Sequence, residues 1–243
     1  MPIEINIPGS KSITNRALVL AALAKGTTII KNAGLCDDTK YMINGLRKLG
    51  INVSQTNSTL RVQGGNFKKS NKPIHIYTGN AGTTTRFLTA VASLTGNKVV
   101  IEGDERMKQR PMTELLEALK NLGPDTKVGG NVSSQFLSAL MMIAPLAKQN
   151  VTITVEQKLC SQPYINMTIE LLKAFGVGVK NKNFAQFFIP KQIIKSPKIF
   201  TVEGDASSAS YFGAYSTLHP EVKIRLKNLP KKSIQGDIKF LDY

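Results

Sequence analysis

Glycine, hydroxyl side chains and positive charge occur together in three short segments of the chain. They are PGSKSITNR from Pro8 to Arg16, GNAGTTTR from Gly79 to Arg86, and DERMKQRP from Asp104 to Pro111. Glycine lets a ligand approach the backbone closely, and arginine presents a planar fork that matches phosphate or carboxylate. We therefore interpret the three segments as candidate anion sites, although a charged, solvated turn would contain the same residue types.

The first segment has the groups needed for both binding and proton transfer. Ser12 can donate beside the backbone amides, Arg16 lies one helical turn further on, and Lys11 supplies a mobile charge that can also carry a proton. In the second segment, the side-chain amide of Asn80 can orient a ligand, and Gly82 leaves the backbone without a side chain. The spacing differs from G-x-x-x-x-G-K-[ST], so a nucleotide P-loop is not indicated.

The composition favours an anionic partner. The 243 residues carry a formal net charge of +16, which fits a phosphorylated metabolite, nucleic acid or an acidic membrane surface. Cys36 and Cys160 lack the spacing of a disulfide framework or a zinc site, and we expect both to be buried or half-buried free thiols. No stretch approaches the roughly 20 apolar residues of a membrane helix, so we expect a globular, cytoplasmic protein without a membrane partner.

Two kinds of predicted helix alternate along the chain and would position these segments. The first kind begins in a Ser/Thr cluster and is apolar nearly all round, which predicts burial in a core; the four examples begin near Ser12, Gly82, Ser133 and Ser207. The second kind is amphipathic and ends before a glycine that is typical of a helix C-cap, at Gly50, Gly123 and Gly176. Short alternating stretches between the helices predict strands, at 60–63, 74–77 and 199–202.

A buried helix that begins in a Ser/Thr cluster has free amides at its positive end, so several such ends together would form a strong anion site. The repeat spacing is uneven, however. It measures 36 positions from Gly50 to Arg86 and 35 from Gly176 to Tyr211, but only 13 from Gly123 to the equivalent Phe136. The middle repeat is therefore shorter by about 22 residues, and the run 123–130 cannot hold the three strands expected in the other repeats. Either this segment was deleted, or the sequence skips residues of the natural chain.

Seven motifs in order resemble 5-enolpyruvylshikimate-3-phosphate synthase. They are GSKSITNRALVLAALAKG, GNAGTTTRFL, GDERMKQRPM, VSSQFLSALMMIAPLA, SQPYI, VEGDASSASYF and SIQGDIKF, and they extend over nearly the whole chain. The resemblance implies an enzyme of aromatic amino-acid synthesis that transfers the enolpyruvyl group of phosphoenolpyruvate to the 5-hydroxyl of shikimate 3-phosphate. No metal ion and no cofactor are expected. Phe87 stands where the family has proline or leucine.

The resemblance also assigns roles to individual residues. Lys11 would contact both substrates and take part in proton transfer. Shikimate 3-phosphate would further be bound by Ser12, Arg16, Ser133, Ser134, Gln135, Ser161 and Tyr164. Phosphoenolpyruvate would be bound by Lys11, Asn80, Gly82, Arg110 and Gln135. Both substrates are multiply anionic, so bringing them together requires dense positive potential. Tyr164 also has the helical spacing of a packing residue.

The implied fold is α/β, an inside-out α/β barrel of the enolpyruvyl transferase type, with repeated βαβαββ units around buried parallel helices. Residues 1–12 and 204–243 would belong to one split domain, and 13–203 would form the complete amino-terminal-half domain with three repeats. The family's second half supplies an Asp, a Glu and further basic residues to the site. We expect this chain to lack them, to bind shikimate 3-phosphate weakly, and to show no detectable turnover.

Three alternative functions compete with this interpretation. A truncated copy could bind its ligand without catalysis. UDP-N-acetylglucosamine enolpyruvyl transferase shares the fold, but it usually has a reactive cysteine in the loop that corresponds to 104–111, and this loop has none. An enzyme similar to RNA phosphate cyclase would suit the net charge, yet the chain lacks an aromatic-interleaved basic stretch. We therefore expect two small-molecule substrates, no nucleic-acid partner and a monomer.

Overall fold

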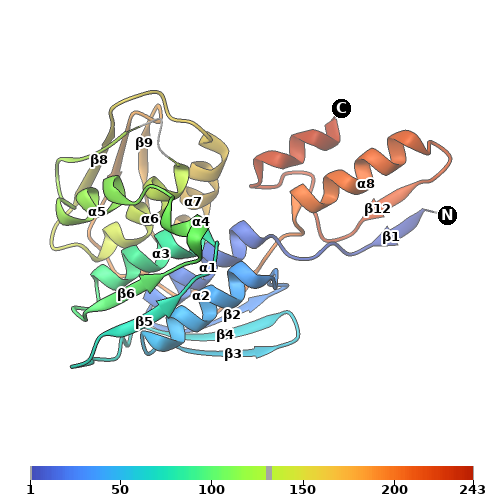
Figure 1. Cartoon of the computed structure of the whole chain (residues 1–243). Helices are drawn as coiled ribbons and strands as arrows, with labels where there is room; N and C mark the ends of the chain where they lie inside the picture. Colours follow the sequence, from blue (N-terminus) through green and yellow to red (C-terminus); the bar gives the residue numbers. More distant parts are fainter. Residues whose placement is uncertain (1, 130–132, 243) are drawn as a thin grey trace.

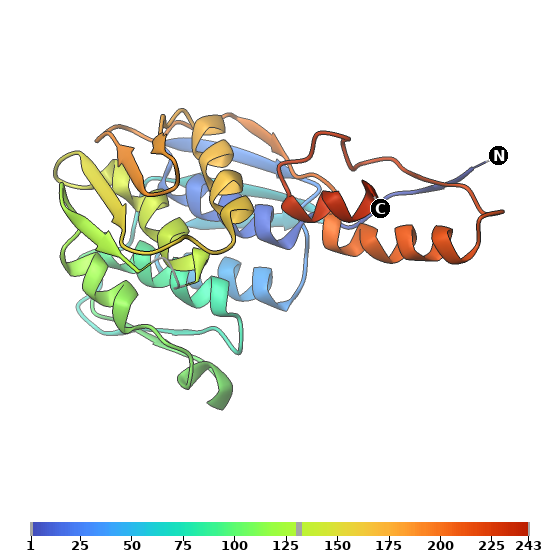
Figure 2. The same cartoon turned by 90° about the horizontal axis from the view of Figure 1, so that it is seen from above.

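The computed structural model describes residues 2–129 and 133–242, which form a larger and a smaller lobe (Figure 1). Of the elements in these described ranges, α-helices α1 to α7, strands β2 to β11 and a short 3-10 helix lie in the larger lobe. Both ends of the chain lie in the smaller lobe, which projects to one side of the larger one (Figure 2). The chain therefore enters and leaves the larger lobe on the same side.

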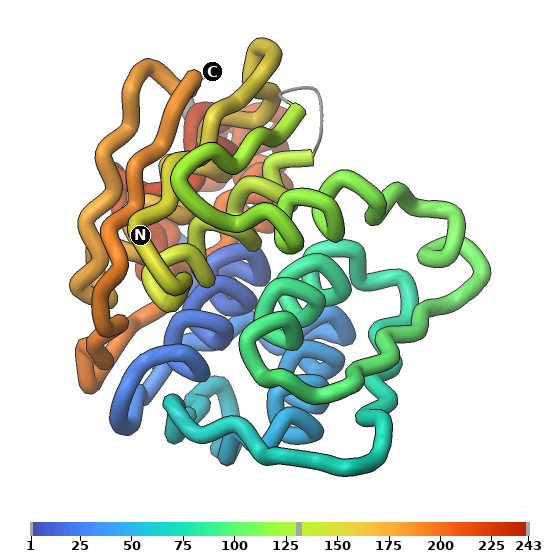
Figure 3. The backbone as a smooth tube through the Cα atoms, turned by 90° about the vertical axis from the view of Figure 1, so that its left-hand side faces the viewer, coloured from blue at the N-terminus to red at the C-terminus, as the bar shows by residue number. Residues whose placement is uncertain are grey.

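Three helices form the interior of the larger lobe, where they contact one another (Figure 3). They are α1 (Lys11–Leu23), α3 (Gly82–Ser93) and α6 (Ser134–Ile143). Each begins at the predicted Ser/Thr cluster, and nearly every residue of α1 from Ile13 to Leu23 is buried. The prediction that helices of this kind are buried is confirmed for these three.

Three amphipathic helices cover the interior ones from outside. They are α2 (Asp37–Lys48), α5 (Thr113–Lys120) and α7 (Gln162–Ala174). Gly50 and Gly176 follow α2 and α7 with φ of +100° and +78°, so the predicted C-cap glycines are confirmed there. The prediction is wrong for Gly123. Helix α5 ends at Lys120 with Asn121 as its C-cap, and Gly123 instead donates its N–H to the Thr126 hydroxyl.

The strands of the first and third repeats form matching four-stranded sheets. The order is β11-β2-β4-β3 in one and β7-β8-β10-β9 in the other, with a parallel pair followed by two antiparallel pairs. The bounds are β2 Gly26–Lys31, β3 Asn52–Thr56, β4 Thr59–Gly64, β7 Thr126–Val128, β8 Val151–Val155, β9 Lys180–Lys182, β10 Gln186–Ile189 and β11 Ile199–Thr201. The predicted architecture of repeated α/β units around parallel buried helices is confirmed.

Within the described residues, the second repeat contains two paired strands, β5 (Ile74–Tyr77) and β6 (Val99–Glu102). Between the amphipathic helix and the next parallel strand lie 25 residues in the first repeat (49–73) and 24 in the third (175–198), but only 5 in the second (121–125). A hairpin corresponding to β3-β4 or β9-β10 has no room there. The structure therefore shows the middle repeat to be shorter than the other two between α5 and β7. Residues 130–132 lie outside the described part of the chain.

The smaller lobe joins the two ends of the chain. Strand β1 (Ile3–Ile5) pairs in parallel with β12 (Ile224–Leu226), beside α8 (Ala206–Leu218) and the 3-10 helix η2 (Gly236–Asp242). The prediction that the fourth Ser/Thr-initiated helix is buried is wrong. In α8 only Ala206 and Ala209 are buried, and Tyr211 and Leu218 are 79% and 77% exposed, because the described residues supply few neighbours for this apolar helix.

Two short helices complete the secondary structure. Helix α4 (Glu105–Lys108) is capped by the Asp104 carboxylate, which accepts from the Met107 amide, and the 3-10 turn η1 (Ala144–Leu146) follows α6. None of the described helices has the length and hydropathy needed to cross a bilayer. The described residues also contain no group of three or more His, Cys, Asp or Glu side chains arranged for a metal ion.

Candidate functional site

A polar cavity of about 650 Å³ is lined by residues of both lobes. Residues from the starts of α1, α6, α7 and α8 line it, together with the loop between β2 and α2. Eight of the predicted site residues share this cavity: Lys11, Ser12, Arg16, Ser133, Ser134, Gln135, Ser161 and Tyr164. The chain thus brings together side chains that lie more than 150 positions apart in the sequence.

The helix starts supply amide donors to the cavity. The N-cap residues of α1 and α7, Ser10 and Ser161, make no side-chain hydrogen bond to their helices, whereas the Ser133 hydroxyl accepts from the Gln135 amide in α6. The first amides of a helix have no partner within it, and they lie at the positive end of the helix dipole. Several helix starts at one cavity therefore favour an anionic ligand.

Arg16 is the strongest electrostatic feature of the cavity. It is only 1% exposed, and burial lowers the pKa of its guanidinium to about 10. Its Nε donates to the Thr168 hydroxyl (2.8 Å), Nη1 to the Ser12 carbonyl (3.0 Å) and Nη2 to the Ser138 hydroxyl (3.2 Å). Among the described residues, no carboxylate forms an ion pair with it. A buried charge without a counter-ion is costly, so the site favours an anion from outside the chain.

Aromatic rings hold the Arg16 guanidinium in place. Its central carbon lies 5.3 Å from the centre of the Phe87 ring and 5.8 Å from that of Tyr164. Burial raises the pKa of the Tyr164 hydroxyl, and the negative charge of Asp237 raises it further. Tyr164 therefore remains a neutral hydrogen-bond donor at physiological pH, and Phe87 forms part of the support for Arg16.

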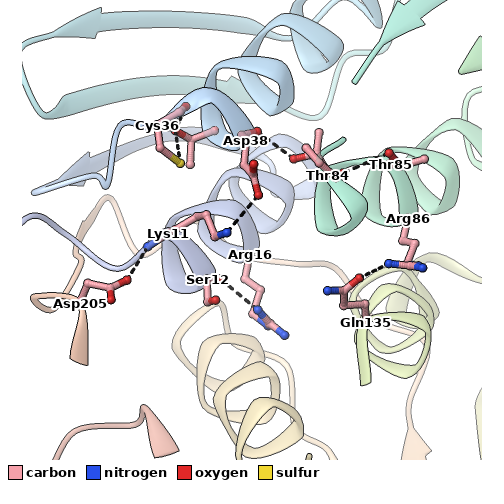
Figure 4. A network of polar contacts seen from close by, with 12 residues as sticks. Lys11, Ser12, Arg16, Cys36, Asp38, Thr84, Thr85, Arg86, Gln135 and Asp205 are labelled. Carbon is pink, nitrogen blue, oxygen red and sulfur yellow. Dashed lines mark hydrogen bonds and ion pairs between the residues drawn. The ribbon is translucent and has the colours of Figure 1, made fainter. Parts of the chain in front are cut away.

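Lys11 lies at the mouth of the cavity with half of its side chain exposed. Its Nζ forms an ion pair with the Asp38 carboxylate at 3.1 Å, and its backbone N–H donates to Asp205 at 3.3 Å (Figure 4). A lysine that is tethered but accessible can reorient toward a bound ligand. Close backbone packing fixes the start of α1, because a side chain on Gly9 would collide with the Asn32 carbonyl oxygen.

Asn80, Gly82 and Arg110 lie outside this cavity and form a second cluster with Arg86. A Cβ atom on Gly82 would collide with Nη1 of Arg110 and would lie 2.8 Å from Nη1 of Arg86. Burial lowers the pKa of Arg86, and the positive charge of Arg110 lowers it further. In the described part of the chain, Nε of Arg86 and Oδ1 of Asn80 are buried without a hydrogen-bond partner. Two neighbouring guanidiniums over a bare glycine favour a second anion.

Gln135 connects the two groups of residues. Its Oε1 accepts a short hydrogen bond from Nη1 of Arg86, while the residue lines the 650 Å³ cavity (Figure 4). Arg86 itself packs over the Phe136 ring, with 5.0 Å between its guanidinium carbon and the ring centre. The arrangement therefore offers two adjacent anion sites bridged by one amide side chain.

Ser161 has a strained backbone at the cavity wall. Its φ and ψ of 57° and 43° lie in the left-handed region, which is unfavourable for residues other than glycine by about 1–2 kcal/mol. Helix α7 begins directly after it with Gln162 and Pro163. Ser161 is thus a backbone outlier at a position predicted to bind a ligand. Its conformation sets the direction in which α7 begins.

Paired substitutions separate the hydroxyl of Ser161 from its backbone. We expect Ser161→Gly and Ser161→Ala to weaken binding of a phosphorylated ligand equally, by about tenfold, because each removes one hydrogen bond to a charged group. Glycine tolerates the left-handed conformation, so Ser161→Gly should have an unfolding free energy about 1 kcal/mol above that of Ser161→Ala. Calorimetric titration and urea unfolding measure the two effects; unequal affinities would contradict the assigned hydroxyl contact.

Sequence reasoning missed several residues at the cavity. Thr83, Cys36, Asp205, Ser207 and Ser208 line it, and Asp38 pairs with Lys11. The Ser cluster at the start of α8 signalled the residues around Asp205, but nothing local distinguishes Asp38. Cys36 is half-buried as expected, whereas the expectation for Cys160 is wrong, because that thiol is exposed.

The sequence matches the family described as EPSP synthase (3-phosphoshikimate 1-carboxyvinyltransferase) in two stretches, residues 2–130 and 123–243. Relatives named 3-phosphoshikimate 1-carboxyvinyltransferase include those of Serratia proteamaculans (42% identical) and Buchnera aphidicola subsp. Schizaphis graminum (44% identical). Each alignment covers 98% of this chain and 61% of the relative, so the chain spans less than two thirds of their length.

Solved structures show the same fold. An EPSP synthase from Acinetobacter baumannii superposes with a TM-score of 0.76 at 20% identity, over 93% of this chain and 55% of that one. A second structure from the same organism gives a TM-score of 0.77. At this identity the likeness concerns the fold alone.

Proposed function

Because the chain belongs to the EPSP synthase family, we propose that it binds shikimate 3-phosphate in the cavity beside Arg16. We further propose that it represents the amino-terminal part of an enzyme that transfers an enolpyruvyl group from phosphoenolpyruvate to this ligand. The observation that carries the proposal is the buried Arg16 guanidinium, which has no carboxylate partner among the described residues and lines the same cavity as Ser133, Ser134 and Ser161. A phosphorylated, hydroxylated ring supplies both the charge and the hydrogen-bond partners that this wall lacks.

In this proposal, the residues of the 650 Å³ cavity bind shikimate 3-phosphate. Ser133, Ser134 and Ser161 bind the 3-phosphate, Ser12 and Arg16 hold the shikimate moiety, and Tyr164 packs against its ring. All six residues line the same cavity, which supports this assignment. All of these groups are donors or cations, as a phosphate ester requires.

The second cluster binds phosphoenolpyruvate in this proposal. Arg110 contacts its phosphate, Gly82 and Asn80 form the neighbouring surface, and Gln135 reaches between the two ligands. The hydrogen bond from Arg86 to Gln135 supports the adjacency of the two sites. Lys11 contacts both substrates and moves a proton, which its exposed position at the cavity mouth allows.

We also propose that residues 1–12 and 204–243 belong to one split domain and that residues 13–203 form the other. The parallel pairing of β1 with β12 and the lining of the cavity by residues of both lobes support this division. In the full-length enzyme, closure of the two domains would surround both substrates and exclude water. The family's further acidic and basic groups would then complete the site.

Turnover by the isolated chain tests the catalytic part of the proposal. We expect no phosphate release above background from these 243 residues with both substrates, because they span only 61% of the length of the Serratia relative. A full-length relative in the same assay is the control. Product formed by the pure chain alone would contradict the assignment of essential groups to the missing half.

A non-catalytic binding domain is the second candidate function. The shortened middle repeat favours it, because the connection between α5 and β7 in this chain is 5 residues long where the other repeats have 24 and 25. Ligand binding without turnover would fit both candidates. Adding the missing portion of a close relative as a separate polypeptide distinguishes them, since only a catalytic half would regain turnover.

A further inference from the structure

Two buried hydroxyl groups contact the Arg16 guanidinium without lining the 650 Å³ cavity. They belong to Ser138 on α6 and Thr168 on α7, and both residues are fully buried. Their oxygens lie 2.8 Å apart, and neither residue is among those that line the cavity. A ligand in the cavity would therefore not touch them, so any effect that they have on its binding acts through Arg16.

The hydrogen bonds of this hydroxyl pair, Ser138 and Thr168, have one consistent direction. The Thr168 hydroxyl donates its single proton to the Tyr164 carbonyl at 2.9 Å. It therefore accepts from the Ser138 hydroxyl, and it also accepts from Nε of Arg16 at 2.8 Å. Ser138 in turn accepts from Nη2 of Arg16 at 3.2 Å. Every proton of the hydroxyl pair thus points away from the guanidinium, and both oxygens present lone pairs to it.

The donor count of Arg16 leaves two N–H groups for a ligand. A guanidinium has five N–H donors. Thr168, Ser138 and the Ser12 carbonyl each accept from a different nitrogen, so three donors are bound within the chain. Arg16 also lines the cavity. The two remaining N–H groups are therefore available there, and the three internal hydrogen bonds set the plane in which they lie.

Arg86 shows that not every buried guanidinium of this chain is held in this way. It donates from Nη1 to Gln135, but its Nε is buried without a hydrogen-bond partner in the described part of the chain. Arg16 is bound at all three nitrogens. If the hydroxyl pair only satisfied a buried charge, its loss would lower the unfolding free energy and leave the affinity for a ligand unchanged.

We propose that Thr168 and Ser138 are positioning residues whose hydroxyl groups fix the Arg16 guanidinium, with its two remaining N–H groups directed at the phosphorylated ligand. Tyr164 takes part through its backbone carbonyl, which accepts the last proton, while its ring lies 5.8 Å from the guanidinium carbon. For the identity of the ligand, shikimate 3-phosphate, the inference rests on the proposed function. The fixed guanidinium is a property of the chain without ligand.

Thr168→Val tests the positioning role, because valine has nearly the shape of threonine and lacks the hydroxyl. We expect the affinity for shikimate 3-phosphate, measured by calorimetric titration, to fall by about tenfold, since Arg16 loses an acceptor that orients it. Thr168→Ser keeps the hydroxyl and should restore the affinity. Thr28→Val is the matched control, because Thr28 is fully buried and donates to the Ser196 hydroxyl at 2.8 Å, away from the cavity.

Nitrogen-15 NMR of the arginine side chains gives a readout that needs no ligand. The Arg16 Nε–H signal, assigned by its absence in Arg16→Met, should exchange with water at least ~10-fold faster in Thr168→Val than in the unmodified chain. Thr168→Ser should exchange as the unmodified chain does. Ser138→Ala is the second variant if Thr168→Val does not fold, and it should show the same two effects.

Unchanged exchange in Thr168→Val and Ser138→Ala would overturn the proposal. Faster exchange with an unchanged affinity for shikimate 3-phosphate would also overturn it, because the hydroxyl pair would then support only the fold. Absence of shikimate 3-phosphate binding by the unmodified chain would contradict the proposed function instead, and the exchange rates would still show whether the hydroxyl pair fixes Arg16.

Discussion

Replacement of Arg16 by methionine is expected to weaken shikimate 3-phosphate binding by more than ~100-fold while the unfolding free energy changes by no more than about 1 kcal/mol. The guanidinium is fully buried, and its pKa, lowered to about 10, shows that the charged form is disfavoured by desolvation. In the folded chain without ligand, three hydrogen bonds offset that penalty. Methionine removes both the desolvation cost of the guanidinium and its three hydrogen bonds, so the two effects on the unfolding free energy oppose each other. Ligand binding has no such compensation, because the ligand loses its buried cation.

The measurement combines calorimetric titration with urea unfolding of the same preparations. Arg61→Met is the matched control, because Arg61 lies exposed on β4 and the substitution removes the same charge without touching the cavity. Equal affinities for Arg16→Met and the unmodified chain would contradict the proposed ligand contact. A loss of affinity of similar size in Arg61→Met would instead assign the effect to net charge.

Gly82→Ala is expected to weaken phosphoenolpyruvate binding by about tenfold, with a much smaller loss of affinity for shikimate 3-phosphate. The added methyl group would meet the guanidiniums of Arg110 and Arg86, so one or both must move away from the position they take over the bare backbone. Gly82 lies outside the cavity that contains Arg16 and the three serines. The substitution should therefore weaken one anion site directly and reach the other only through the hydrogen bond between Arg86 and Gln135.

Competition between phosphoenolpyruvate and a fluorescent anion, measured in the presence and absence of shikimate 3-phosphate, tests this prediction. Gly178→Ala is the matched control, since a Cβ atom there meets nothing within 4 Å. If Gly82→Ala reduced the affinity for shikimate 3-phosphate as strongly as that for phosphoenolpyruvate, the two clusters would not be separate sites.

The sequence predicted the interior helices and the position of the short repeat because both depend on local patterns. Apolar residues all round a segment that follows a Ser/Thr cluster marked α1, α3 and α6. Uneven spacing from each predicted capping glycine to the next helix of this kind marked the second repeat. The same reasoning failed for α8, because burial depends on what else packs against a helix. Its apolar surface is present, but the described residues leave Tyr211 and Leu218 exposed.

Long-range contacts explain what the sequence could not predict at the candidate site. Asp38 becomes relevant only because the fold brings it to Lys11, 27 positions earlier, and Asp205 reaches the backbone of Lys11 across 194 positions. The missing counter-ion of Arg16 is likewise a property of the packed structure. Residue types in the motifs predicted an anion site, but only the packing shows which guanidinium is buried and which two share Gly82.

We propose above all that the helix starts and Arg16 form a site for a phosphorylated ligand within this chain. The most direct measurement is a calorimetric titration of the unmodified chain with shikimate 3-phosphate and, separately, with shikimate. We predict that shikimate 3-phosphate binds at least ~30-fold more tightly, because the phosphate adds two or more charge-assisted hydrogen bonds. Equal affinity for the two compounds, or no heat of binding with either at millimolar concentration, would contradict the claim.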